Sequence, residues 1–158
     1  MAPASIVLRA ATNADKAFVV EMARHACVIE DRPLPDADDD EVLEMLPPAD
    51  ARPIIAENPH AEPLGAVWTY YGRTPLRRDA MGAPLPELCI AVVPGHRGAG
   101  IGGMLLDALF VDLAPHHAAM CTNVHLRNPA KRLYERKGFR GAGQGNGPLG
   151  LAMIKELR

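Results

Sequence analysis

Eight residues near the middle of the chain, H-R-G-A-G-I-G-G at 96–103, constrain its fold more than any other stretch. The apolar run at 88–93, which ends at Pro94, is typical of a strand covered on both faces. After the glycines, apolar residues recur at helical spacing over 101–112. A strand, a glycine-rich turn and a helix start together bring backbone N–H groups and the positive end of the helix to one anion site. The stretch therefore predicts an α/β or α+β fold with an anion held at this turn.

Two nucleotide-binding folds share glycine-rich turns of this kind. Gly98, Gly100 and Gly103 satisfy G-x-G-x-x-G, the pattern of dinucleotide-binding folds. That fold also needs an early βαβ unit and an acidic residue about 20 positions further on, but residues 118–123 read A-A-M-C-T-N. A P-loop needs Lys-Ser or Lys-Thr after its glycines, and neither follows here. The sequence argues against both folds.

The remaining segments alternate between helix, strand and loop patterns. A strand is expected at 6–9, followed by a helix that begins at Thr12 or Asn13 and ends at about Ile29. Further strands are expected at 54–56, 64–71, 88–93, 119–126 and 149–154, and further helices after the acidic residues 38–41, at 101–112 and at 129–138. Residues 72–86 are expected to form a loop, and the glycines from Gly141 onward a turn.

A second motif, N-P-A-K-R-L-Y-E-R-K-G-F, occupies 128–139. The first motif, extended to I-A-V-V-P-G-H-R-G-A-G-I-G at 90–102, resembles the acetyl-CoA motif of the GNAT (Gcn5-related) N-acetyltransferases, and the second is similar to their N-x-A-x-x-L-Y-x-x-x-G-F segment. The N-terminal half resembles the family in organisation only. The resemblance implies the GNAT fold, a mixed and mostly antiparallel central sheet of six to seven strands flanked by about four helices. A splayed strand pair would form the acetyl-CoA cleft, and residues 1–158 would form a single N-acetyltransferase domain.

The resemblance implies acetyl-CoA as the cosubstrate and assigns its contacts. The pyrophosphate would rest on backbone N–H groups of the glycine turn, and the strand at 90–92 would run beside the pantetheine arm. A backbone N–H near Val92 would stabilise the oxyanion that forms on the acetyl carbonyl. Asn128 is interpreted first as a helix cap and, by resemblance, as a hydrogen-bond partner of the cofactor. The implied cofactor-binding residues are Ile90, Ala91, Val92, Arg97, Gly98, Ala99, Gly100, Ile101, Gly102, Gly103 and Asn128.

Direct transfer to an amine requires two proton movements, one away from the ammonium group and one to the departing thiolate. By resemblance Tyr134 is the general acid, and its alternative role is packing on its own helix. Glu87 begins the cofactor strand, where several family members place a catalytic carboxylate; its alternative is a strand-end carboxylate in solvent. His125 and a water relay are further candidates for the base, whereas Asn123 cannot act as one.

The implied activity is transfer of an acetyl group to a primary amine of a small molecule or peptide, by direct attack through a tetrahedral intermediate. The alternative is a catalytically inactive acyl-CoA-binding regulatory module; the two intact motifs favour the enzyme. The acceptor stays open. Arg73, Arg77 and Arg78 suggest an acceptor with a carboxylate or phosphate, whereas the acidic residues at 36–41 suggest a cationic acceptor or simply a helix N-terminus.

Composition limits the partners. Seventeen Lys and Arg against 19 Asp and Glu give a net charge of −2, so nucleic acid is not the expected partner. No apolar run is long enough to span a membrane and no signal peptide is visible, so a cytoplasmic protein is expected. Its thiols are expected to be reduced, and Cys89 and Cys121 fall within predicted strands, which argues against an acetyl-cysteine route. No metal site is expected, and a homodimer is one expectation from the resemblance.

Overall fold

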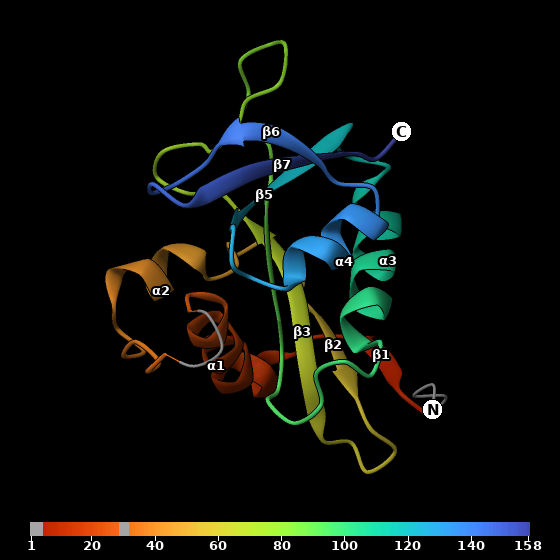
Figure 1. Ribbon diagram of the computed structural model, residues 1–158. Helices are drawn as coiled ribbons and strands as arrows, with labels where there is room; N and C mark the ends of the chain where they lie inside the picture. Colours follow the sequence, from red (N-terminus) through yellow and green to blue (C-terminus); the bar gives the residue numbers. More distant parts are fainter. Residues whose placement is uncertain (1–4, 29–31) are drawn as a thin grey trace.

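The computed structural model describes residues 5–28 and 32–158. Within these ranges, seven strands form one sheet in the order β1-β2-β3-β4-β5-β7-β6 (Figure 1). Neighbouring strands are antiparallel except for β4 and β5, which are parallel. The strands are β1 (Val7–Ala10), β2 (Ile54–Glu57), β3 (Pro63–Tyr70), β4 (Glu87–Val92), β5 (Ala119–His125), β6 (Arg140–Gln144) and β7 (Gly150–Glu156). The helices are a 3₁₀ turn (Asn13–Asp15), α1 (Lys16–Ala26), α2 (Asp40–Met45), α3 (Ile101–Leu113) and α4 (Ala130–Arg136). The mixed, mostly antiparallel sheet that the sequence predicts is confirmed.

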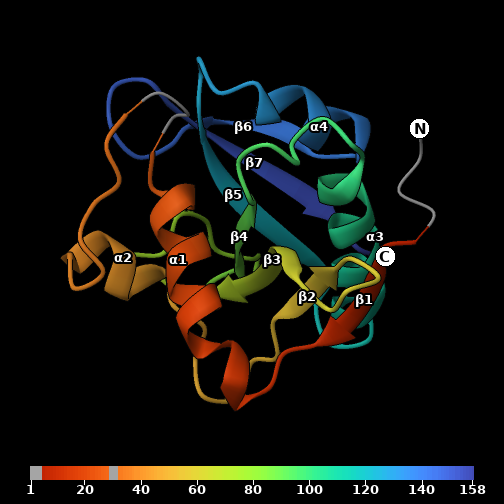
Figure 2. The same cartoon turned by 90° about the horizontal axis from the view of Figure 1, so that it is seen from below.

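Helices cover both faces of the sheet, with α1 and α2 on one side and α3 and α4 on the other (Figure 2). The side chains of strand β4 point alternately to the two faces of the sheet. Leu88, Ile90 and Val92 pack into the core beneath α3, whereas Cys89 and Ala91 pack toward α1. Successive side chains of a strand point to opposite faces, so an apolar run supplies both cores at once.

Strands β4 and β5 are joined at one end only. Glu87 and Cys121 are register partners, and the Cys121 N–H donates to the Pro86 carbonyl at 2.9 Å. No further ladder pair between β4 and β5 occurs in the described part of the chain. Exposure rises along β4 in the same direction, from buried Glu87 to half-buried Val92. The two strands therefore diverge toward the glycine turn, as the splayed pair implied by the family resemblance does.

Residues 72–86, which we call the strap, cross from the end of β3 to the start of β4 and cover part of the sheet. The strap packs on β5 and β7 in a small separate core whose buried members are Leu76, Leu85, Cys121 and Ala152. Arg77 extends from it to the edge of the sheet, where its guanidinium donates to the carbonyls of Ala142 and Gln144. The tip of the strap, residues 78–84, projects from the molecule at the top of Figure 1. The expected loop is thus an ordered cover with a projecting tip.

Two boundary predictions need correction. The glycines from Gly141 onward are expected to form a turn, but Arg140–Gln144 form strand β6, which pairs with β7 and shifts register between Gly141 and Gln144. R-G-A-G-Q shows no apolar alternation, so its strand character comes from pairing with β7. The helix predicted from Thr12 starts as the 3₁₀ turn and ends as α1 at Ala26; its predicted end at Ile29 lies outside the described residues. No helix in the described ranges has the length and apolar character to cross a membrane.

Candidate active site

The glycine turn is exposed and leads directly into α3. Gly95, Gly98 and Gly100 have φ values of 92°, 79° and 86°, a left-handed region that only glycine adopts without cost. Gly100 is the N-cap residue of α3. The N–H groups of residues 100–103 donate to no main-chain carbonyl within the described residues. Four such groups at the positive end of a 13-residue helix form a place where an anion can bind.

Gly102 and Gly103 have a second purpose, which is close packing. A Cβ on Gly102 would lie 3.2 Å from Leu133 Cδ2, and one on Gly103 would lie 3.3 Å from Lys137 Cε. The first turn of α3 can therefore lie against α4 and the residue that follows it. This contact places the second sequence motif beside the first.

The free edge of β4 offers main-chain groups to the gap between β4 and β5. The Val93 N–H donates to a β3 carbonyl at 2.7 Å. Because main-chain groups alternate between the two edges of a strand, those of Ala91 also face β3, and those of Ile90 and Val92 face the gap. Arg97 donates from Nε to the Val92 carbonyl at 3.3 Å. Of the three strand residues predicted to bind cofactor, two present their backbone to the gap.

Tyr134 of α4 lies inside the core under α3, with 7% of its surface exposed. Its ring packs against Phe139, with the ring centroids 5.6 Å apart. Burial raises the pKa of its hydroxyl, and the Cys89 thiol on β4 contributes to this rise. The hydroxyl therefore stays protonated at neutral pH, within electrostatic range of Cys89 on β4.

Glu87 is 4% exposed, so the alternative of a strand-end carboxylate in solvent is wrong. Its Oε2 accepts from the Leu76 N–H at 3.4 Å, and the nearby Gly72 N–H and Tyr70 hydroxyl also favour its charged form. Burial raises the pKa of the carboxyl despite these donors. A carboxylate whose pKa moves toward neutrality is suited to accept a proton.

A second carboxylate that sequence reasoning missed approaches the same point from α2. A Cβ on Gly72 would lie 3.3 Å from Glu87 Oε2 and 3.9 Å from Glu44 Cδ, so both acidic groups border this glycine. Glu44 also accepts from the Arg73 N–H at 3.2 Å and lies 3.3 Å from its Nε. Burial raises the pKa of Glu41, and Asp39 and Glu44 add to the effect. The acidic run thus continues into the site through Glu44.

The other predicted residues have mainly local partners. Asn128 accepts from the Ala130 N–H at 2.9 Å and so caps α4, as the first interpretation predicts. His125 Nδ1 accepts from the Arg127 N–H at 3.1 Å, which ties the imidazole to its own turn. Asn123 accepts from the Asn146 N–H at 2.8 Å in the β6–β7 connection.

The buried thiols are unreactive. Cys89 and Cys121 are both buried, and burial raises the pKa of Cys121 to about 12. A thiol with such a pKa is not a nucleophile at neutral pH. In the described ranges, no group of three or more His, Cys, Asp or Glu side chains is arranged to hold a metal ion.

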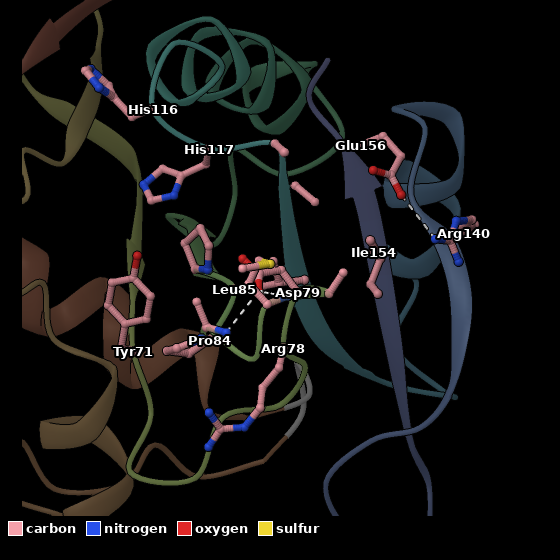
Figure 3. Close-up of a pocket in the computed structure, with 16 residues that line it drawn as sticks. Tyr71, Arg78, Asp79, Pro84, Leu85, His116, His117, Arg140, Ile154 and Glu156 are labelled. Carbon is pink, nitrogen blue, oxygen red and sulfur yellow. Dashed lines mark hydrogen bonds and ion pairs between the residues drawn. The ribbon is translucent and has the colours of Figure 1, made fainter.

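The three strap arginines all have protein partners. Arg73 pairs with Glu44, Arg77 donates to carbonyls of β6, and Arg78 donates to the Gly82 carbonyl at 2.8 Å. Exposed Arg78 lines a cavity of about 880 Å³ between the strap and the ends of β5 and β7 (Figure 3). None of the predicted site residues lines this cavity. The choice between an anionic and a cationic acceptor therefore stays a prediction.

Solved structures share this architecture over nearly the whole chain. YncA of Salmonella typhimurium, solved with its cofactor acetyl-CoA, is 21% identical, with 98% of this chain and 95% of that chain covered and a TM-score of 0.70. A chimera of the spermidine N-acetyltransferase SpeG from Vibrio cholerae is 22% identical, with 97% and 96% covered and a TM-score of 0.65. A ribosomal-protein-alanine N-acetyltransferase from Brucella melitensis is 21% identical, with 95% and 99% covered and a TM-score of 0.67.

At these identities the likeness concerns the fold. No curated protein sequence matches the chain. The sequence model of the acetyltransferase (GNAT) domain matches residues 53–141, more than half of the chain, and the match includes both the glycine turn and the Tyr134 motif. The chain therefore belongs to the acetyltransferase (GNAT) domain family.

Proposed function

We propose that this protein transfers the acetyl group of acetyl-CoA to a primary amine by direct attack. The observation that carries the proposal is the half-open strand pair, with the glycine turn at its open end and Glu87 and Tyr134 around its joined end. An acyl donor with a phosphate at one end and a reactive thioester at the other fits this arrangement.

The residues present fit acetyl-CoA. The N–H groups of residues 100–103 would hold the pyrophosphate together with the positive end of α3. The main-chain groups of Ile90 and Val92 would pair with the amides of the pantetheine arm. Asn128 uses Oδ1 to cap α4, which leaves its side-chain N–H groups for the cofactor. The acetyl-CoA in the structure of YncA supports this choice of donor.

The proton movements fall to Glu87 and Tyr134. Glu87 takes a proton from the ammonium group, and the resulting amine attacks the thioester carbonyl carbon. A main-chain N–H of β4 near Val92 that is not paired with the pantetheine arm would stabilise the oxyanion of the tetrahedral intermediate. The C–S bond then breaks, and Tyr134, protonated at neutral pH, gives its proton to the departing sulfur. The new amide nitrogen gives up its remaining extra proton, which restores the Tyr134 hydroxyl.

The acceptor is a small molecule or peptide that carries a primary amine, and a second positive charge would favour it. Glu41, Glu44 and Glu87 bring three carboxylates to this side of the sheet, and Arg73 is the strap arginine paired among them. The spermidine N-acetyltransferase SpeG, which has the same fold, supports a cationic acceptor.

A thiol-release assay with acetyl-CoA across amines tests the activity. The panel contains spermidine, a lysine peptide, an aminoglycoside and neutral amino acids. We expect turnover with at least one cationic amine. Binding of CoA in calorimetry without thiol release from any amine would contradict the proposal and support the binding module instead.

Tyr134→Phe tests the acid role, because Phe keeps the ring packing on Phe139 and loses only the proton. We expect kcat with the best amine to fall about 100-fold. An unchanged kcat would leave Tyr134 with packing alone. Tyr71→Phe, which removes an exposed hydroxyl elsewhere, is the matched control.

A further inference from the structure

Tyr70 and Glu87 are cross-strand partners in the last register pair of β3 and β4. Directly opposite residues of an antiparallel pair share one face, with Cβ atoms about 5 Å apart. The Tyr70 hydroxyl lowers the pKa of the Glu87 carboxyl as a nearby hydrogen-bonding group, and Glu87 raises the pKa of Tyr70 in turn. The Tyr70 ring packs against the core under α1, so its position is fixed.

The remaining donors to this carboxylate come from the strap. The Leu76 N–H lies 3.4 Å from Glu87 Oε2, and the Gly72 N–H is the other donor. Gly72 also lacks the Cβ that would stand 3.3 Å from this oxygen. Leu76 and Gly72 thus reach the carboxylate from the strap, whereas Tyr70 reaches it from strand β3.

We propose that Tyr70 is a positioning residue for Glu87: its hydroxyl holds the carboxylate, in its charged form, in the orientation that faces the acceptor amine. This inference rests on the proposed function, in which Glu87 accepts the proton of the amine. Tyr70 acts through Glu87 and is assigned no contact with the reacting atoms.

The charged and titratable groups around the carboxylate determine in which direction the pKa of Glu87 will shift when Tyr70 is changed. They are Tyr70 from β3, Glu44 from α2 with its partner Arg73 of the strap, Cys89 on β4 and Cys121 on β5. Burial and Glu44 raise the pKa of Glu87, and its hydrogen-bond donors lower it. Loss of the Tyr70 hydroxyl removes a donor that favours the charged form, so the pKa of Glu87 must rise.

Tyr70→Phe tests the inference, with Tyr71→Phe as the matched control. The control removes the neighbouring hydroxyl, which belongs to a 47% exposed ring that borders the separate cavity (Figure 3). The first readout is the pKa of Glu87 by carboxyl ¹³C NMR, with the resonance assigned through Glu87→Gln. We expect Tyr70→Phe to raise this pKa by about one unit and Tyr71→Phe to leave it unchanged.

The second readout is the acid limb of kcat/KM against pH. In Tyr70→Phe the limb moves to higher pH by the same amount, and activity recovers well above the new pKa. A residue that only packs moves neither readout, so an unshifted NMR titration overturns the inference. Fluorescence of the single tryptophan, Trp68, confirms that each variant is folded.

The same experiments separate this inference from the function on which it rests. If Glu87→Gln abolishes the acid limb while Tyr70→Phe leaves the NMR titration unshifted, the base role stands and the positioning role of Tyr70 is wrong. If Glu87→Gln keeps wild-type turnover and pH profile, the base role of Glu87 is wrong, and the inference falls with it. Thiol release with any amine supports the acetyltransferase activity in either case.

Discussion

Two carboxylates on this chain are almost equally buried, yet their pKa values are shifted in opposite directions. Asp15 is 6% exposed and Glu87 is 4% exposed. Arg9 donates to both oxygens of Asp15, at 2.8 and 2.9 Å, and this lowers the pKa of Asp15 to about 2. Glu87 faces Glu44 and neutral donors instead, and burial raises its pKa. Asp15 therefore forms a structural ion pair with Arg9, whereas the raised pKa of Glu87 suits it to accept a proton.

The Asp15 pair predicts an acid-sensitive stability. Because its pKa in the folded state lies below the ordinary value of 3.8, its contribution is complete above that value and is lost as the pH falls toward 2. We expect about 2 kcal/mol of unfolding free energy from this residue. Urea unfolding between pH 7 and pH 2 should show Asp15→Asn to be less stable at pH 7 and less dependent on pH below 4.

Asp107→Asn is the control for this series. Asp107 also pairs with a cation, Lys137 at 2.9 Å, but its side chain is 62% exposed, and exposed pairs contribute little. An Asp15→Asn protein whose stability falls with acid as steeply as the wild type would refute the assignment.

Among the elements, the glycine turn needs glycine both for its left-handed backbone and for the proposed binding of CoA. Two alanine substitutions can measure these two requirements separately. Gly98 and Gly82 have similar φ values of 79° and 85°, and a Cβ on either would meet no atom within 4 Å. An alanine at each position therefore costs only backbone strain. Gly98 lies in the proposed pyrophosphate site, while Gly82 lies at the tip of the strap.

We expect Gly98→Ala and Gly82→Ala to lose similar unfolding free energy, about 1 kcal/mol each. Only Gly98→Ala should bind acetyl-CoA more weakly, since the added methyl group and the altered turn disturb the cradle. Calorimetric titration with CoA and urea unfolding measure the two effects. Equal CoA affinity in the two variants would remove Gly98 from the binding site.

The strap is a second element whose role can be measured. Half-buried Arg77 ties it to the edge strand β6 through the carbonyls of Ala142 and Gln144, while exposed Arg78 bonds only within the tip. An arginine that fills the open edge of β6 also protects it from pairing with another chain.

Arg77→Met keeps the aliphatic stem and removes the donors. We expect it to lower the unfolding free energy by about 1 to 2 kcal/mol and to speed amide hydrogen exchange in β6. Arg78→Met should change stability by about 0.5 kcal/mol or less. Equal exchange rates in β6 for both variants would show that Arg77 does not hold the strap.

At the scale of the whole molecule, one sheet carries separate cores on its two faces. The core under α3 and α4 contains Tyr134, and the core under α1 and α2 contains Trp68, whose Nε1 donates to the Met45 carbonyl at 2.8 Å. Strand β4 contributes side chains to both. A shared strand couples the cores, so a single cooperative domain remains the prediction.

Trp68 permits a direct check, because it is the only tryptophan. Its fluorescence reports the core under α1 and α2, while far-UV circular dichroism reports all elements. We expect the two urea unfolding curves to coincide, as a two-state transition requires. Separate midpoints would mean that the two faces unfold independently.

Features that depend on neighbours along the chain could be predicted from the amino-acid sequence alone. The left-handed glycines, the helix that follows them and the Asn128 cap are local, and their patterns predicted the turn, α3 and α4. The two-residue period of a buried strand likewise predicted the division of β4 between two cores. Together with the second motif, these features were enough to indicate the fold and the family.

Features that depend on strand register and on contacts between distant segments became visible only in the folded chain. Strand β6 forms because it pairs with β7. The backbone groups of Ala91 pair with β3, so they do not face the gap between β4 and β5. Glu87 is buried because Gly72 of the strap and Glu44 of α2 close around it. No local pattern records which residues meet across a sheet, so the surroundings that give Glu87 its chemistry could be read only from the folded chain.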